Sequence, residues 1–310
     1  MVTLAIVISL VFFLARSAGT DPFERYLSED PRIPPEQIQR LRARFGLDKP
    51  LYMQYFDFIR NTLQGEFGYS LYFHRPVFDV VRERMPYTLF LLSISIIIST
   101  IVSFTVGVYF AWKRGTKIDL WGTNVCMFIR STPHFWLGMI LLIVFAYYYP
   151  IFPLFGALTP GITYSNTFEY IGDLLYHATL PLTTLIVREI GMYVLYMRNS
   201  TVEVLGEDYM VTAKAKGVPP MSIMFKHAAR NAMLPMVTVT ALRFGFMVNG
   251  AILTETVFSY PGMGRLIYQA ITNDDFFLLQ GAFFIIAVTV LIANLVADLI
   301  CAWLDPRIKI

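Results

Sequence analysis

Long runs of apolar residues are the feature that most constrains the fold of this chain. The runs at about 86–112, 120–148, 178–198, 233–257 and 280–303 are each long enough for a helix that crosses a bilayer, which needs about 20 apolar residues. Hydrophobic residues make up 56% of the 310 residues and charged ones only 15%, whereas soluble domains average roughly 45–50% and about 25%. We therefore predict an all-α integral membrane protein that is surrounded by lipid.

A shorter apolar run opens the chain at 2–15. A cleaved signal peptide is the alternative interpretation, but there is no basic segment before the run and no small-residue cleavage site after it. We expect a first transmembrane helix that begins upstream of the residue numbered 1, which would bring the number of spans to six.

The charges of the short loops predict how the spans are oriented. Residues 113–117 are basic, residues 149–176 contain no Lys or Arg, and the end of the chain carries Arg307 and Lys309. Because Lys and Arg concentrate in cytoplasmic loops, this alternation places both termini in the cytoplasm. The pattern also places 149–176 outside the cell.

The polar segment 17–84 lies between the first two spans, and we expect it outside. Pro35 opens one predicted helix, and an apolar stripe of Tyr52, Tyr55, Phe56 and Ile59 marks a second. The shift in composition near Met85 divides the chain into two parts. Residues 1–84 hold the first helix and the extracytoplasmic segment, and residues 85–310 hold a five-helix core.

A polar loop at about 199–232, between the fourth and fifth spans, has the pattern of a helical hairpin. Its first helix ends in Lys214 and then Gly217, where a basic last turn and a terminating glycine are expected. Pro219 and Pro220 prevent simple continuation. We predict that the second helix begins near Ser222, with this serine as its N-cap.

The hairpin carries a family resemblance. The segment EDYMVTAKAKG, followed by HAARNAMLP, resembles the cytoplasmic EAA loop of ABC importer permeases of the dipeptide/oligopeptide branch. Further segments of the chain, in the same order, are similar to that branch: RSTPHFWLGMILL, ETVFSYPGMGRLIYQAI, NLVADLI and LDPRI. The pattern departs from the general motif at two points. Val211-Thr212-Ala213 stands where the loop's name implies Glu-Ala-Ala, and the distance from Gly217 to Leu234-Pro235 is longer, although this length suits the peptide branch.

The resemblance implies a function and a set of partners. The chain is expected to be the transmembrane permease subunit of an ATP-driven importer in a prokaryotic plasma membrane, with a di- or oligopeptide as solute; an oligosaccharide or nickel permease of the same family is the alternative. Expected partners are a second homologous permease, two ATP-binding subunits that hold ATP and Mg, an extracytoplasmic solute-binding protein and membrane lipid. By resemblance, coupling to an ATP-binding subunit falls to five residues of the hairpin: Glu207, Asp208, Ala213, Lys214 and Gly217.

Four charged residues within or near the predicted spans are candidates for lining the solute pathway: Arg130, Arg188, Glu189 and Arg243. A charge at mid-membrane costs on the order of 2.5–3.5 kcal/mol, so each needs a partner or water. The alternative role is pairing across helices, for example Glu189 with Arg243. Arg188 and Glu189 point about 100° apart on a helix, so we do not expect them to pair with each other.

Signatures of catalysis and of nucleic-acid binding are missing. There is no GxxxxGK[ST] phosphate loop, no HExxH and no CxxC, so we expect no enzyme activity, cofactor or metal on this chain. Ser131 and His134 are too close in sequence to suggest a protease pair. Basic clusters interleaved with aromatic residues are also absent, which argues against nucleic acid.

Two other classes of function remain. A stand-alone channel or secondary transporter would favour internal repeats or paired interrupted helices, which the sequence does not show. A membrane-anchored sensor working through segment 17–84 would leave the hairpin unexplained. Replacement of Gly217 by a bulky residue distinguishes the importer from these two classes, since only the importer should lose coupled ATP hydrolysis.

Overall fold

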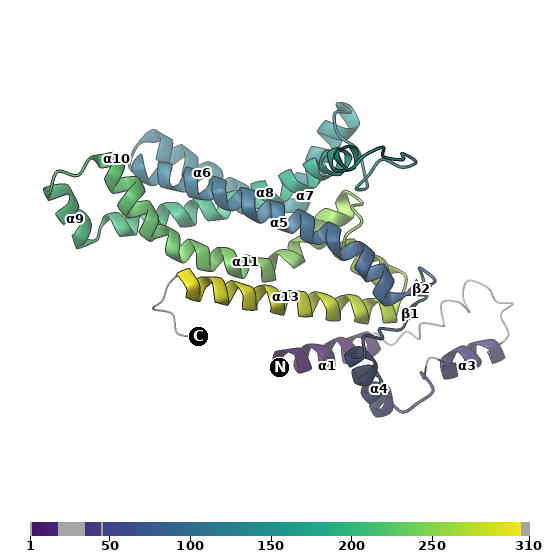
Figure 1. Cartoon of the computed structure of the whole chain (residues 1–310). Helices are drawn as coiled ribbons and strands as arrows, with labels where there is room; N and C mark the ends of the chain where they lie inside the picture. The colour runs from purple at the N-terminus through teal and green to yellow at the C-terminus, as the bar shows by residue number, and fades with distance from the viewer. Residues whose placement is uncertain (1, 18–34, 45, 305–310) are drawn as a thin grey trace. The chain divides into compact units, whose positions relative to one another are not determined.

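The computed structural model describes residues 2–17, 35–44 and 46–304, and nearly all of the regular structure among them is helical (Figure 1). The chain forms two compact units. One comprises Met1–Pro86 and Gly262–Thr289, and the other comprises Tyr87–Pro261 and Val290–Ile310. Residues 18–34 of the predicted outer segment and the basic residues after 304 lie outside the described part.

The first unit contains short helices, a small hairpin and the ends of two long helices. Its elements are α1 (Val2–Ser17), α3 (Pro35–Arg44), α4 (Leu51–Leu63), β1 (Tyr69–Ser70), β2 (Arg75–Pro76), the start of α5 (Val77–Trp112), α12 (Met263–Thr272) and the start of α13 (Phe276–Leu304). The strands pair antiparallel, Tyr69 opposite Pro76 and Ser70 opposite Arg75. The helices predicted at Pro35 and around Tyr52–Ile59 are confirmed as α3 and α4.

The carboxylate of Asp275, which is 1% exposed, joins this hairpin to α13. It accepts hydrogen bonds from the Ser70 hydroxyl (2.6 Å), the Tyr72 amide (3.1 Å) and the Leu278 amide (3.0 Å). The last of these bonds caps the first turn of α13. An apolar cluster that includes Val77, Val80 and Leu278 packs beneath the hairpin.

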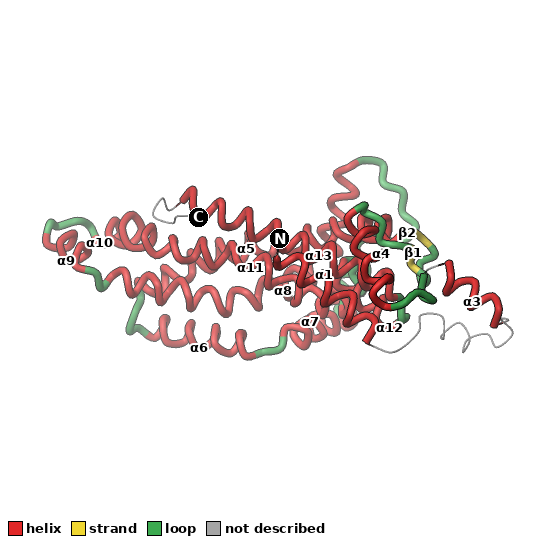
Figure 2. Tube along the Cα trace, turned by 90° about the horizontal axis from the view of Figure 1, so that it is seen from below, coloured by secondary structure: helices red, strands yellow, loops and turns green. Residues whose placement is uncertain are grey.

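The second unit contains the long apolar helices and the polar hairpin. Its elements are most of α5, then α6 (Lys117–Ser131), α7 (His134–Leu142), η1 (Ile143–Tyr148), α8 (Thr167–Leu205), α9 (Asp208–Ala215), α10 (Pro220–Ser222), η2 (Ile223–Ala228), α11 (Ala229–Val257) and the end of α13. Figure 2 shows the same helices as tubes seen from below.

Glycines allow α8 to approach its neighbours closely. A Cβ on Gly107 of α5 would lie 2.7 Å from the Met197 Cβ and 2.9 Å from the Val194 carbonyl oxygen of α8. A Cβ on Gly191 of α8 would lie 3.0 Å from the Arg130 amide nitrogen of α6. A side chain larger than hydrogen at these two positions would force α8 away from α5 and from α6.

Three helices in the described part of the chain are long and apolar enough to cross a membrane: Val77–Trp112, Thr167–Leu205 and Phe276–Val296. The pair Lys117–Ser131 and His134–Tyr148 would be a fourth span, although it is bent by 92° at the break before His134. The bend falls at Thr132 and Pro133, where the proline interrupts the helix. The chain is a multi-pass membrane protein, and the count of six spans stays a prediction.

Two long helices begin earlier than predicted. Helix α5 starts at Val77 rather than 86, because Val77, Val80 and Val81 have apolar partners to bury against. Helix α8 starts at Thr167 rather than 178, because Asn166 accepts from the Glu169 amide (2.9 Å). The Glu169 carboxylate in turn accepts from the amide of Ser165 (2.9 Å), the residue before the N-cap, so Asn166 and Glu169 both stabilise the start of the helix. The loop predicted at 149–176 is therefore shorter than expected.

This loop is fixed to α8 by Asp173. The Asp173 carboxylate accepts hydrogen bonds from the Thr159 amide (2.6 Å) and from the Tyr164 hydroxyl (2.6 Å). The bond to a negative acceptor stabilises the protonated phenol and raises the pKa of Tyr164 to about 12.

Candidate functional site

The polar hairpin between α8 and α11 is the candidate site, and its first helix is α9. Glu207 precedes it as N-cap, Asp208 lies in the first turn, and Lys214 lies in the last. Acidic residues at the start and basic ones at the end of a helix suit its dipole. Eight residues are too few for a stable isolated helix in water, for which about 12–15 are needed. Contacts with the rest of the unit must therefore hold α9 in place.

Helix α9 ends in a Schellman motif. Gly217 has φ +75°, its amide donates to the Lys214 carbonyl (3.0 Å), and the Val218 amide donates to the Ala213 carbonyl (3.3 Å). This left-handed conformation costs an L-residue roughly 1–2 kcal/mol, and glycine adopts it freely. The prediction that Gly217 terminates the first helix is confirmed.

The second helix of the hairpin begins before the predicted residue. Pro219 is the N-cap and Pro220 the first helical residue, where the fixed φ of proline and its missing N–H are suited to a helix start. The Ser222 amide already donates to the Pro219 carbonyl (2.9 Å). Ser222 therefore lies inside the helix, and the prediction that it is the N-cap is wrong. The break at the two prolines is confirmed.

One fully buried side chain, that of Met210, fixes α9 to the membrane helices. It is 0% exposed and belongs to what we call the hinge cluster. The buried members of this cluster are Val108, Tyr193, Met197, Met210, Ile223, Met224, Ala228, Ala229, Ala232 and Met236. They come from α5, α8, α9, η2 and α11, whose ends meet near α9 and α10 (Figure 1). A hydrogen bond from the Asn231 side chain to the Tyr209 hydroxyl (2.8 Å) adds a polar link.

The other face of α9 is open. Val211 is 60% exposed, Tyr209 is 45% exposed, and Lys214 is also exposed. Of the five residues that resemblance assigns to coupling, Glu207, Asp208, Lys214 and Gly217 are exposed. Ala213 is half-buried and packs against the hinge cluster. Helix α9 therefore exposes a small surface of apolar and charged side chains, while its opposite face is packed on the hinge cluster.

A groove of about 420 Å³ lies beside the hairpin. It is lined by Ala111, Trp112, Leu205, Lys214, Val218, Pro220, Ile223 and Met224. The Trp112 ring stacks on Phe225, with 6.4 Å between the ring centroids. The last turn of α5 and both helices of the hairpin therefore contribute to the walls of this groove.

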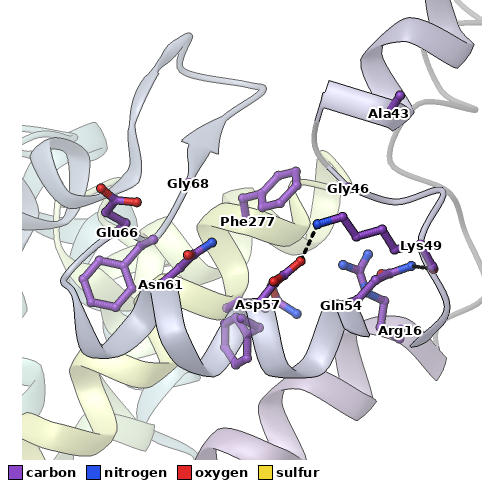
Figure 3. Close-up of a pocket in the computed structure, with 13 residues that line it drawn as sticks. Arg16, Ala43, Gly46, Lys49, Gln54, Asp57, Asn61, Glu66, Gly68 and Phe277 are labelled. Carbon is purple, nitrogen blue, oxygen red and sulfur yellow. Dashed lines mark hydrogen bonds and ion pairs between the residues drawn. The ribbon is translucent and has the colours of Figure 1, made fainter. Parts of the chain in front are cut away.

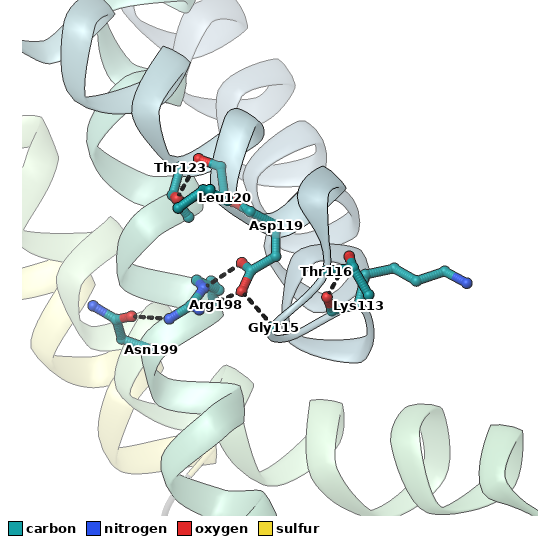
Figure 4. Close-up of polar contacts among 8 residues, drawn as sticks. All are labelled: Lys113, Gly115, Thr116, Asp119, Leu120, Thr123, Arg198 and Asn199. Carbon is teal, nitrogen blue, oxygen red and sulfur yellow. Dashed lines mark hydrogen bonds and ion pairs between the residues drawn. The ribbon is translucent and has the colours of Figure 1, made fainter.

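An ion pair that the sequence did not predict joins α6 to α8. The Arg198 guanidinium donates to both Asp119 carboxylate oxygens, through Nε at 2.8 Å and Nη2 at 2.6 Å (Figure 4). The same carboxylate accepts from the Gly115 amide (3.1 Å), which fixes the basic loop before α6. Asp119 is only 5% exposed, so this bidentate contact is protected from solvent. The sequence held one indication of this ion pair, an acidic residue two positions after the basic stretch 113–117.

The candidate pathway residues lie on three helices, with Arg130 on α6, Arg188 and Glu189 on α8, and Arg243 on α11. Arg188 and Glu189 of α8 lie close to Gly191, which packs against the backbone of Arg130 in α6. Contrary to expectation, Arg188 and Glu189 approach each other, with 3.9 Å between Arg188 Nε and a Glu189 carboxylate oxygen. Long side chains bridge the 100° between their attachment points. The Arg243 side chain lies outside the described part of the structure, so its predicted pairing with Glu189 stays a prediction.

The sequence matches two family models. Residues 103–310 match the binding-protein-dependent transport system inner membrane component, and residues 1–95 match the N-terminal region of membrane components of such systems. The matches together cover the hairpin, the long helices and the outer segment.

Relatives in several bacteria cover almost the whole chain. The dipeptide transport system permease protein DppB of Escherichia coli K12 is 35% identical over 89% of this chain and 86% of its own length. The oligopeptide transport system permease protein AppB of Bacillus subtilis is 34% identical over 97% of this chain and 93% of its own length. The glutathione transport system permease protein GsiC of Escherichia coli is 34% identical over 99% of this chain and 95% of its own length. The chain belongs to the family of binding-protein-dependent transport system inner membrane components, as the permease subunit of an ABC importer.

Proposed function

We propose that this subunit imports peptides, forming the solute pathway together with a second, homologous permease. The family name implies an external solute-binding protein and ATP-binding partners, and the similar permeases are named for dipeptides, oligopeptides and glutathione. All three solutes are peptides, which favours a peptide over an oligosaccharide or nickel. Two ATP-binding subunits hold ATP and Mg in this proposal, because the chain has no phosphate-binding loop.

The proposed topology has six spans with both termini in the cytoplasm. The basic loop 113–117 and the hairpin 199–232 then face the same side, and segment 17–84 faces outside. The hinge cluster supports this arrangement, since the end of α5 that leads into the basic loop and the end of α8 that leads into the hairpin contribute to one core.

Coupling to ATP hydrolysis is the proposed role of α9. One observation carries it: an eight-residue helix has its inner face fixed by Met210 to a core shared with α5, α8 and α11, and its outer face is exposed. A push on that face by an ATP-binding subunit moves the ends of three long helices together. Glu207, Asp208 and Lys214 provide charges for the contact, and Gly217 sets the turn that presents them.

The solute pathway is proposed to use Arg130, Arg188, Glu189 and Arg243. Glu189 is 8% exposed and Arg188 lies beside it, so a charged pair is available within α8 for the charged ends of a peptide. Cysteines placed at 188 and 243 should react with water-soluble thiol reagents in at least one transport state. Failure to react in every state would contradict a pathway role.

The coupling proposal is tested with two glycines in equivalent conformations. Gly217 and Gly115 have φ of +75° and +81°, and a Cβ added at either position would have no other atom within 4 Å. Gly217→Ala and Gly115→Ala should therefore introduce the same strain of roughly 1–2 kcal/mol. Only the first lies in the proposed coupling hairpin.

The measurement is ATP hydrolysis by the reconstituted complex, with and without solute-loaded binding protein. Gly217→Ala should reduce the stimulated rate several-fold and leave complex assembly intact, whereas Gly115→Ala should keep most of the stimulation. Equal stimulation in both variants would contradict a coupling role for this hairpin.

A further inference from the structure

A polar pocket of about 250 Å³ lies in the unit formed by Met1–Pro86 and Gly262–Thr289. Four helices contribute to it: the last turn of α1 with Arg16, the end of α3 with Ala43, helix α4 with Asp57, and the first turns of α13 with Phe277 and Gln280. Figure 3 shows Arg16, Gln54, Asp57, Asn61 and Glu66 around it, with Phe277 behind. Helices α1 and α4 are joined by a hydrogen bond between Ser9 and Tyr55 (2.6 Å).

Two buried polar atoms in the pocket wall have no hydrogen-bond partner among the described residues. One is Nε2 of Gln280, a residue only 4% exposed, and the other is Oε1 of Gln54. The Gln54 amide is held in one orientation because its Nε2 donates to the Leu47 carbonyl (3.2 Å) and the Lys49 carbonyl (2.8 Å). A buried polar group without a partner is destabilising. A ligand that accepts from Gln280 and donates to Gln54 would satisfy both.

Charges of both signs surround these two atoms. Lys49 and Asp57 form an ion pair at 2.6 Å, and each remains nearly half exposed. Arg16 adds a cation and Glu66 an anion. A wall with balanced charges and neutral amides fits a zwitterion better than an anion or a cation, because each end of a zwitterion finds an opposite partner.

The depth of the pocket indicates where such a ligand comes from. Phe277 and Gln280 lie in the first turns of the candidate span Phe276–Val296, and the ends of a span lie near the boundary between the hydrocarbon and the headgroups of a bilayer. Phe58 and Phe67 provide an apolar part of the wall. A lipid headgroup reaches this level with its acyl chains already in the membrane.

We propose that this pocket binds the zwitterionic headgroup of a membrane phospholipid of the phosphoethanolamine type. Its ammonium group donates to Gln54 Oε1 and to Asp57, and its phosphate accepts from Gln280 Nε2 and from Lys49. Most of its lining comes from the segment that we propose to face outside, and binding there does not depend on which solute the subunit transports. A free peptide carries the same two charges without acyl chains, so the test includes one.

The test uses the full chain in its purified complex, stripped of lipid and examined by native mass spectrometry. The probes are dioctanoyl phosphatidylethanolamine, dioctanoyl phosphatidylglycerol and dialanine. The variants are Gln280→Met, which removes the buried donor, and Asp57→Asn, which removes a half-exposed charge. Gln64→Met is the matched control, since Gln64 is exposed at the end of α4 and lies outside the pocket.

We expect the unmodified chain and Gln64→Met to retain phosphatidylethanolamine in preference to phosphatidylglycerol. Each pocket variant should bind it about tenfold more weakly, which is the effect of one lost charge-assisted hydrogen bond. Added phosphatidylethanolamine should also raise the unfolding temperature of the unmodified chain and not that of the variants. Should Gln280→Met fail to fold, the surface variant Asp57→Asn decides the question.

Three results would overturn the proposal. They are equal retention of the two lipids, unchanged retention in Asp57→Asn, and displacement of the lipid by dialanine. The last result would assign the pocket to a peptide instead of a lipid.

Discussion

Replacement of Met210 by alanine tests how α9 is attached. Met210 is 0% exposed and is the only fully buried residue of an eight-residue helix within the described structure. Truncating a buried Met to Ala typically costs about 2–5 kcal/mol. Because α9 keeps its half-buried Ala213 and the bond between Asn231 and Tyr209, we expect about 2 kcal/mol. That value corresponds to roughly a 30-fold rise in the population in which α9 has come off the hinge cluster.

Hydrogen exchange of the α9 amides, with the complex in lipid nanodiscs, measures that population directly. Exchange of amides 212–216 should accelerate by about the same factor, while amides in the middle of α8 keep their rates. Val211→Ala is the control, because Val211 lies on the same helix and is 60% exposed. If the two variants exchange at equal rates, Met210 is not the anchor and the hinge cluster does not hold the hairpin.

Two further substitutions test the packing of the units. Asp275→Ala leaves two buried donors, from Ser70 and Leu278, and the part-buried Tyr72 amide without their acceptor. At roughly 1–3 kcal/mol for each buried donor before relaxation, it should lower the thermal unfolding temperature by several degrees, and a shift no larger than that of a surface substitution would contradict the assigned role. Gly191→Ala places a Cβ 2.8 Å from the Ile129 side chain and 3.0 Å from backbone atoms of α6, so unfolding in detergent should become easier by about 1–3 kcal/mol. Gly172→Ala on the same helix has no neighbour within 4 Å, and equal effects of the two glycine substitutions would contradict close packing at Gly191.

Local chemistry explains which parts of the hairpin could be predicted. The terminating role of Gly217 and the break at Pro219 depend on the backbone freedom of single residues, so the sequence was sufficient for both. The N-cap of the second helix was placed wrongly because serine is a common N-cap, whereas Pro220 is suited to the first helical position and starts the helix two residues earlier. Competing local signals of similar strength cannot be ranked without the tertiary contacts.

Contacts between distant segments were beyond the sequence. The pair Asp119–Arg198 joins residues 79 positions apart, and Asp275 joins to Ser70 across 205 positions. Neither spacing follows from helical periodicity, which extends over a few turns only. The approach of Arg188 and Glu189 was also missed, because the angle between adjacent Cβ atoms does not limit the reach of two long side chains.

A photo-crosslinking amino acid at Val211, introduced in intact membranes, tests whether α9 contacts an ATP-binding subunit. Val211 is on the open face of α9, at the end of the 39-residue helix α8, which is about 58 Å long at 1.5 Å per residue. Phe168, which is 87% exposed at the opposite end of α8, is the control position. Position 211 should crosslink to an ATP-binding subunit, identified by mass spectrometry, and position 168 should not. Absence of that product from position 211, in membranes where the complex is assembled, would contradict the coupling role of the hairpin.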